Sequence, residues 1–489
     1  MGWSSDEPKS TKKKMETSTK ILIAIIACVL IIITLILVLL LNIQTNTFNL
    51  LIDAKIKSNY DINKLITRID DITYINIEEF AKLVGYEYHG GEYKSFTIEE
   101  GKCYVQGSEE TATFYANDNK VCKLPVNLLQ EDYREYKVEN TIKTKNDKMY
   151  APIEAISLAF NVSIGEDIDS MTIYTLDYLV KYYNNKVTGW GYSDITEQSF
   201  ENKKAILYGY LIVNKEKGLY KIIDDSNSKE IVPDKYTAIE FSENTQEFLV
   251  TNSLGQVGII NLDGSTKIEP TYDSISVLNK SADLYLIQKN EKYGVVKSGN
   301  VTVIVPEYDD IGLNNISSDS IIDNKYFLLD KLIPVSKVNK WGAFDKNGKL
   351  VLKLEYDRFG CPVTSVEIND TEKAVEPVIT IDRCKGIVVE KDKKYGVLDL
   401  SGKEMVPIAV ENIYAIKNVE DEDSRYFMIY NGEELNVIER LIIAGFIEPK
   451  KEEKEEEKEE NNIIENNIIT VDITENNTVN NQIGNNSVN

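Results

Sequence analysis

The segment KWGAFDKNGKLVLKLEYDRFG, from Lys340 to Gly360, indicates how the larger part of this chain folds. Two apolar runs flank the turn sequence KNGK, in which glycine can adopt the positive φ that a tight hairpin requires. The second run ends in tyrosine and aspartate, and Gly342 lies 14 residues before Tyr356. These features predict two antiparallel strands joined by a hairpin.

The same pattern recurs over residues 206–442. The sequences EFLVTNSLGQVGII, LYLIQKNEKYGVV, LIPVSKVNKWGAF and GIVVEKDKKYGVL each join an apolar strand, a polar hairpin and a strand with a leading glycine. An earlier copy is stretched by four residues, and the last copy has Val410 where the others have tyrosine. The positions that mark the copies are Gly218, Gly258, Gly294, Gly342, Gly396, Trp341, Tyr236, Tyr272, Tyr308 and Tyr356.

One such unit cannot bury both of its faces, so neighbouring units must stack into an all-β repeat domain. Successive leading glycines are 40, 36, 48 and 54 residues apart, which places insertions around 313–332 and 361–385. Four short strands per unit suit a propeller blade, and an open β-solenoid is the alternative because the sequence does not show whether a ring closes. We expect the tyrosine rings to pack between units, and the aspartates that follow three of them to cap turns.

These residues resemble the WG-containing repeat family, also called KWG repeats, and residues 340–360 are the clearest copy. The resemblance covers five copies, with a partial sixth in YFMIYNGEELNVI. Repeat scaffolds present extended binding surfaces, so the resemblance implies a recognition role without naming a ligand.

Residues 21–41, ILIAIIACVLIIITLILVLLL, contain no charged side chain. A helix of this length rises about 30 Å, the thickness of the hydrocarbon core of a bilayer, so we predict a single transmembrane helix. Lysines precede the segment, and the positive-inside rule therefore places residues 1–20 in the cytoplasm and the bulk of the chain on the extracytoplasmic side of the cell membrane. The run IIAC at residues 25–28 loosely resembles a bacterial lipobox, but thirteen apolar residues follow Cys28.

Residues 71–180 are expected to form a small α+β domain. The segments YINIEEFAKLVGYEY, from Tyr74, and YAPIEAISLAFNVSI, from Tyr150, each place apolar residues at helical spacing after a short extended piece. They resemble the copper amine oxidase N-terminal-like domain of bacterial envelope proteins. The histidine ligands and the cofactor tyrosine of such an oxidase have no counterpart here, so the resemblance implies no oxidase chemistry.

The remaining segments connect or follow these parts of a multi-domain chain. Residues 42–70 are expected to form a helical or flexible stalk, and residues 181–205 a linker. Residues 446–489 are rich in Glu, Lys and Asn and have too few apolar side chains to build a core, so we predict a disordered acidic tail.

Composition excludes several classes of function. The net charge of −24, from 79 acidic and 55 basic residues, argues against nucleic acid as a partner. The single histidine, His89, lies in a Gly-rich turn, which disfavours catalytic triads and most metal sites. Phosphate-binding, dinucleotide and HExxH motifs are absent from the sequence. We therefore expect no catalytic residues, no metal and no cofactor.

Four cysteines follow the membrane segment in two local pairs. In an extracytoplasmic domain this spacing permits the disulfides Cys103–Cys122 and Cys361–Cys384. Free buried thiols fit the sequence equally well, because spacing does not show whether the β-carbons meet.

Taken together, these features favour a non-enzymatic, membrane-anchored protein of the cell envelope. Its repeats would present a surface to a protein or a cell-wall polymer. A sensor or an accessory subunit of a cell-wall enzyme is the alternative, and a glycan-active enzyme is a third hypothesis.

Overall fold

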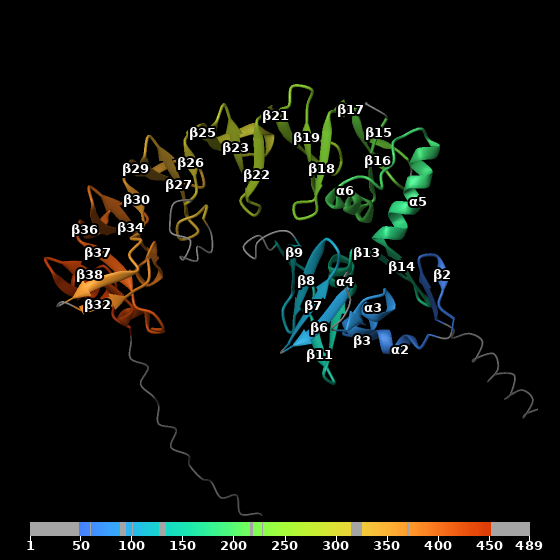
Figure 1. Ribbon diagram of the computed structural model, residues 1–489, viewed down its shortest axis with the longest axis horizontal. Helices are drawn as coiled ribbons and strands as arrows, with labels where there is room; N and C mark the ends of the chain where they lie inside the picture. Colours follow the sequence, from blue (N-terminus) through green and yellow to red (C-terminus); the bar gives the residue numbers. More distant parts are fainter. Residues whose placement is uncertain are drawn as a thin grey trace, which may run out of the picture.

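The computed structural model describes residues 48–450, apart from 59, 89–93, 100, 127–133, 216–218, 227, 314–324 and 369–370. Figure 1 shows an N-terminal α+β domain and a long arc of β-sheets whose concave side faces that domain. Within these described ranges, no helix combines the length and the apolar character needed to cross a bilayer. The predicted transmembrane helix at 21–41, the segment 1–20, His89 and tail residues 451–489 lie outside the described residues.

Three sheets build the α+β domain. The largest has the strand order β10-β9-β8-β7-β6-β5, and the others have the orders β11-β12-β4-β3 and β13-β14-β1-β2. Strands β1 and β14 pair in parallel, as do β5 and β6. The strands are β1 (Asn49–Ile52), β2 (Lys55–Ile56), β3 (Ile66–Ile69), β4 (Ile72–Asn76), β5 (Glu87–Tyr88), β6 (Ser95–Glu99), β7 (Lys102–Gln106), β8 (Glu110–Tyr115), β9 (Lys120–Pro125), β10 (Arg134–Lys137), β11 (Lys143–Lys145), β12 (Lys148–Pro152), β13 (Val162–Glu166) and β14 (Ser170–Thr175).

Two helices of this domain form where the apolar spacing predicts them, α3 (Ile77–Leu83) and α4 (Ile153–Phe160). The side chain of Asn76 caps α3 by accepting a hydrogen bond from the Glu79 N–H at 3.2 Å. Both helices bury their apolar side against a common core, in which the rings of Phe80 and Phe160 meet edge to face with centroids 5.0 Å apart. A short helix, α2 (Ile62–Leu65), precedes them.

The predicted stalk and linker are wrong for the residues that the structure describes. Residues 48–69 belong to the α+β domain, because β1 pairs along its whole length with β14, from Asn49 opposite Ser170 to Ile52 opposite Ile173. The recurring Leu and Ile residues that suggested a stalk are core positions, and Leu50 is buried. The linker region holds most of α5 (Leu176–Gly189), all of α6 (Phe200–Lys204) and the start of the 3-10 helix η2 (Ala205–Tyr208).

In the described part of the chain, six successive antiparallel sheets form the arc, and we number them one to six in chain order. Each of the sheets two to five follows the order first, second, third, fourth strand, like the blade that the sequence predicts. Their strands are β15 (Tyr210–Asn214), β16 (Tyr220–Asp224) and β17 (Glu230–Tyr236) in sheet one; β18 (Ala238–Ser242), β19 (Glu247–Thr251), β20 (Val257–Asn261) and β21 (Thr266–Tyr272) in sheet two; and β22 (Ser274–Asn279), β23 (Leu284–Lys289), β24 (Lys292–Lys297) and β25 (Val301–Tyr308) in sheet three.

The later sheets carry the insertions expected from the glycine spacing. They contain β26 (Asp310–Ile311), β27 (Leu332–Lys337), β28 (Lys340–Asp345) and β29 (Leu350–Tyr356) in sheet four; β30 (Arg358–Phe359), β33 (Thr380–Ile381), β34 (Gly386–Lys391), β35 (Lys394–Leu398) and β36 (Glu404–Val410) in sheet five; and β37 (Asn412–Ala415), β38 (Tyr426–Tyr430) and β39 (Glu433–Asn436) in sheet six. Figure 1 shows these sheets along an open arc rather than a closed ring.

Both ends of the arc are covered by elements outside the repeat. At the start, α5 and η2 share a core with sheet one, including Val180, Ile206 and Leu211. At the end, α7 (Val437–Ile443) packs beside sheets five and six, and the hairpin of β31 (Ser365–Ile368) and β32 (Thr371–Ala374) covers sheet six. Such caps are what a repeat array needs, because its terminal units have an apolar face without a neighbour.

Candidate functional site

The four leading glycines that the structure describes, Gly258, Gly294, Gly342 and Gly396, each lie in the third strand of a sheet. At Gly294, an added β-carbon would lie 2.7 Å from the Ile304 carbonyl oxygen and 2.8 Å from the Pro306 nitrogen. The pairing of β24 with β25 is irregular at this point, and the fourth strand passes directly over the glycine. Gly258, Gly342 and Gly396 have the same close contacts, so backbone approach, not a positive φ, demands glycine here. Gly218 lies outside the described residues.

The second glycine of each unit behaves as the hairpin prediction requires. Gly264, Gly299, Gly348 and Gly402 all have positive φ, between 74° and 86°. They close the hairpin between the third and fourth strands. This prediction is confirmed.

The repeat tyrosines pack between neighbouring sheets, as expected. Tyr308 ends sheet three and shares a core with Ile333 and Val335 of sheet four. Tyr236, Tyr272 and Tyr356 are buried in the corresponding places. Trp341 is also buried, and its ring meets that of Phe359 edge to face. The positions found from the sequence are therefore structural.

The aspartates that follow three of the repeat tyrosines each join two sheets. One carboxylate oxygen of Asp309 accepts a hydrogen bond from the Val338 N–H at 2.6 Å, in the hairpin of the next sheet, while the other lies 2.5 Å from Lys292 Nζ. The hydrogen bonds from Lys292 and Val338 lower the pKa of Asp309. Asp273 and Asp357 cap the following hairpins in the same way, which confirms the predicted turn-capping role.

The cysteines form neither of the permitted disulfides. Cys103, Cys122, Cys361 and Cys384 are free and buried. Strand β8 lies between the strands of Cys103 and Cys122, and the two residues oppose Phe114 and Thr113, whose side chains point to opposite faces of the sheet. Cys103 and Cys122 therefore cannot meet, because a disulfide needs α-carbons less than about 7 Å apart and converging side chains. Burial raises the pKa of Cys103 to about 12 and that of Cys384 to about 11.

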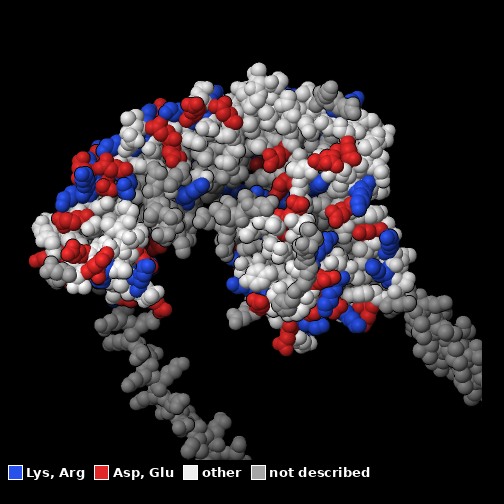
Figure 2. Space-filling view, in the orientation of Figure 1, with Lys and Arg blue, Asp and Glu red and all other residues white. Residues whose placement is uncertain are grey.

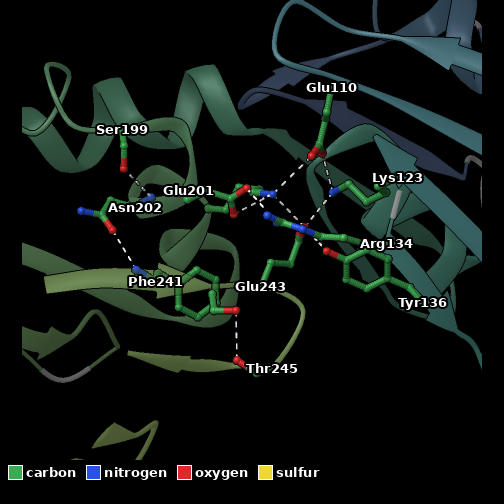
Figure 3. A network of polar contacts seen from close by, with 12 residues as sticks. Glu110, Lys123, Arg134, Tyr136, Ser199, Glu201, Asn202, Phe241, Glu243 and Thr245 are labelled. Atoms are coloured by element: carbon green, nitrogen blue, oxygen red, sulfur yellow. Dashed lines mark hydrogen bonds and ion pairs between the residues drawn. The ribbon is translucent and has the colours of Figure 1, made fainter. Parts of the chain in front are cut away.

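The contact between the α+β domain and the arc contains a buried network of charges, drawn in Figure 3. Lys123 of β9 lies 2.5 Å from Glu110 of β8 and 2.8 Å from Glu243, which belongs to the turn between β18 and β19. Lys204, at the end of α6, lies 2.8 Å from the same Glu243 and 3.3 Å from Glu110. Lys123 is 1% exposed and Lys204 is 0% exposed, so this cross-link lies out of contact with bulk water.

The network is closed by further partners at its edge. Glu201 lies 3.1 Å from Lys204 and 3.2 Å from Arg134. Three cations, Lys123, Arg134 and Lys204, thus face three carboxylates, Glu110, Glu201 and Glu243, and the charges balance. Burial alone would raise the pKa of Glu243, but Lys123 and Lys204 hold it below its ordinary value. Glu243 therefore stays ionised and acts as a fixed link between the two parts of the chain.

Beside this network, the surface is hollowed into a cleft with a volume of about 810 Å³. Figure 2 shows the hollow between the α+β domain and the arc. One wall comes from β10 and α4, including Tyr136 and Glu154, and the other from the turns of sheets two and three, including Gln246 and Lys280. A cleft of this size falls in the range that proteins use to bind ligands.

The polar groups at the floor of the cleft are already engaged. The hydroxyls of Tyr136 and Tyr208 donate to Glu243 at 3.4 and 3.3 Å, and burial followed by that carboxylate raises the pKa of both tyrosines. Across the described ranges, no group of three or more His, Cys, Asp or Glu side chains could hold a metal ion. The cleft thus lies between two walls that the buried charge network joins.

Sequence reasoning found the repeat scaffold and missed this site. Lys123 and Glu243 are 120 residues apart, and each stands among ordinary strand and turn residues, KVCKLP and FSENTQ. No local spacing marks them. Only the docking of the arc onto the α+β domain brings them together.

Comparison with known proteins agrees with the repeat assignment. The WG containing repeat family matches residues 258–293 and 341–362, so the chain carries WG repeats. No curated protein matches the chain. The solved structures that match include the WD40 β-propeller domain of Doa1, at 8% identity and a TM-score of 0.17, covering 65% of this chain and 86% of that one. PorZ of the type-IX secretion system of Porphyromonas gingivalis has 8% identity and a TM-score of 0.18, covering 68% of this chain and 37% of that one.

Proposed function

We propose that the chain is a non-enzymatic, membrane-anchored protein of the cell envelope whose β-repeat arc binds a protein or a cell-wall polymer. The predicted helix at 21–41 would hold it in the cell membrane, with the α+β domain and the arc on the extracytoplasmic side. The α+β domain, which resembles the copper amine oxidase N-terminal-like domain, would serve as the support on which the arc is mounted.

The observation that carries this proposal is the cleft with its two fixed walls. A ligand between the walls touches both parts of the chain, and the buried charges of Lys123, Lys204 and Glu243 keep the walls from separating. Binding to such a preformed site does not have to order mobile walls, which preserves affinity. The cleft is rimmed by polar side chains such as Glu154, Gln246 and Lys280, which suits a polar polymer or a peptide.

The proposal is tested by binding of the full-length protein in detergent to isolated cell walls and, separately, to solubilised envelope proteins. Ser281 lines the cleft and is exposed, so Ser281→Trp should obstruct it and reduce retention. Ser365→Trp makes the same change on an exposed strand residue of β31 and should leave retention unchanged. Equal retention of both variants, or no retention of the parent protein by either preparation, would contradict the proposal.

A further inference from the structure

In sheets two to six, the first strand leaves one edge without a strand partner in its own sheet, and the structure shows how most of these edges are closed. Figure 1 places β18 and β22 on the concave side of the arc. In sheet two, Asn202 of α6 covers the edge of β18: its side chain accepts from the Phe241 N–H at 2.8 Å and donates to the Ile239 carbonyl at 2.9 Å. A single side chain thus takes the place of a neighbouring strand, which prevents pairing with another chain.

The backbone position of Phe241 has an equivalent in each of the sheets three to six, and its N–H group has a hydrogen-bond partner in all of these sheets except sheet three. This position is the fifth residue after the repeat tyrosine, or after Val410 in the last copy. The N–H groups at this position donate to partners outside their own sheet strands as follows: Phe241 to Asn202 Oδ1 at 2.8 Å, Leu313 to the Lys325 carbonyl at 2.7 Å, Cys361 to the Val378 carbonyl at 2.8 Å and Ala415 to the Glu376 carbonyl at 3.0 Å. The equivalent residue in sheet three is Val277.

Val277 has no such partner in the described part of the chain. From Ser274 opposite Gln288 to Val277 opposite Tyr285, strand β22 pairs with β23 in the same way that β18 pairs with β19 from Ala238 opposite Thr251; the register of β22 shifts only after Val277. The N–H of Val277 and the carbonyl of Ile275 therefore point away from β23, like those of Phe241 and Ile239. No described donor or acceptor reaches either group.

The open edge leads into the cleft. Strand β22 ends at Asn279, and the next two residues, Lys280 and Ser281, line the cleft. Ser274 and Ser276, which alternate with Ile275 and Val277 along the strand, are exposed and small, so their side chains do not hinder approach to the edge. An extended segment on this edge would continue directly between the two walls.

We propose that β22 binds an extended polypeptide segment as an additional β-strand, with one end of the segment in the cleft. This inference rests on the proposed binding function and specifies its ligand as a polypeptide. Alternate residues of an edge strand offer a donor and an acceptor at intervals of about 6.8 Å, the repeat of an extended peptide backbone. A glycan lacks that regular alternation of N–H and C=O groups.

The test uses the full-length protein in detergent and a phage-displayed library of random linear peptides as the probe. Selected peptides are synthesised and their affinities measured on the parent protein, on Val277→Pro and on Val277→Ala. Proline removes the outward N–H, which makes no hydrogen bond within the sheet, whereas alanine shortens the side chain and keeps the N–H. We expect the proline variant to bind about tenfold more weakly than the alanine variant, the loss expected for a main-chain hydrogen bond.

A second measurement keeps the test decisive if Val277→Pro fails to fold. Methylating single backbone nitrogens of the peptide should weaken binding to the parent protein at alternate residues only, because every second N–H of an added strand faces β22. Equal effects at all residues, equal binding to the two variants, or selection of no peptide would overturn the proposal. If the parent protein nevertheless binds cell walls or envelope proteins, the proposed binding function stands and only the proposal about β22 is wrong. Slow hydrogen exchange of the Val277 amide in the monomeric protein without peptide would show that the chain closes this edge itself, and would also overturn it.

Discussion

Lys123→Met removes one charge from the buried network and leaves its carboxylates without balance. In the parent protein Lys123 Nζ lies 2.5 Å from Glu110 and 2.8 Å from Glu243, and it also donates to the Leu158 carbonyl and to Asn161 Oδ1. After the substitution, three carboxylates face two cations, and the net charge of the buried cluster is −1. Breaking one side of a buried ion pair costs about 3–5 kcal/mol of unfolding free energy, because the remaining charge is unpaired out of water.

The partner substitution provides the decisive comparison. Glu243→Gln alone leaves an excess positive charge and should destabilise the protein by a similar amount. The double variant Lys123→Met/Glu243→Gln restores equal numbers of charges, so its loss should fall short of the sum of the single losses. We expect a coupling free energy of at least about 2 kcal/mol, within the range of residues that share a buried network.

The assay is urea unfolding of the full-length protein, monitored by tryptophan fluorescence. Thermal unfolding measured by calorimetry provides a second value. Trp341 reports on sheet four, and Trp190 follows α5 beside sheet one. The matched control is the exposed pair Lys394–Glu411, with a distance of 3.1 Å and side chains 46% and 36% exposed, for which the same pair of changes should cost under about 1 kcal/mol. Additive losses in the buried pair, or losses no larger than in the control pair, would refute the view that this network holds the two parts together.

Three further results are expected. Gly294→Ala should lower the unfolding free energy by roughly 2–3 kcal/mol, because the added β-carbon would overlap the Ile304 carbonyl. Gly299→Ala should lower it by only about 1 kcal/mol, because Gly299 has φ 74° but open space around it; thermal unfolding measures both losses. The pKa of Glu243 is lowered in the folded state, so ionised Glu243 stabilises the fold fully above its ordinary pKa of 4.5, and this stabilisation is lost as the pH falls below that value. Glu243→Gln should therefore reduce the slope of the unfolding free energy against pH in this acid range. Burial raises the pKa of Cys103 to about 12, so in the folded protein at pH 8 this thiol should resist iodoacetamide and react only after unfolding, as mass spectrometry of the labelled peptides would show.

The repeat could be derived from the sequence because its determinants are local. Gly294 and Tyr308 are 14 residues apart, and the hairpin between them fixes both positions within one sheet. The physical reason for the leading glycine was not visible, since it depends on how β25 passes over β24. Spacing reveals that a position recurs, and packing shows why it must be glycine.

Contacts between distant segments escaped the same reasoning. Strand β1 pairs with β14 in parallel, more than a hundred residues away, so nothing local in its recurring Leu and Ile residues distinguishes a core strand from a stalk. Lys123 lies in the strand sequence KVCKLP, where a lysine would ordinarily be expected to face solvent. No neighbouring residue in the sequence indicates that its side chain is only 1% exposed. A buried charge can be recognised only when its partners are known, and these come from another part of the fold.

The uneven length of the repeats has a structural meaning that follows from the edges of the first strands. The insertions at 313–332 and 361–385 supply Lys325, Val378 and Glu376, whose carbonyls close the edges of sheets four, five and six. Sheets two and three have only short turns after their first strands, so they carry no insertion of their own for this purpose. Sheet two borrows Asn202 from α6, which lies against β18. Sheet three is one position farther along the arc from α6 and has neither an insertion nor a described substitute. The interval of 36 residues between Gly258 and Gly294, the shortest in the array, thus marks the part of the repeat that has no closing segment among the described residues and that opens toward the cleft.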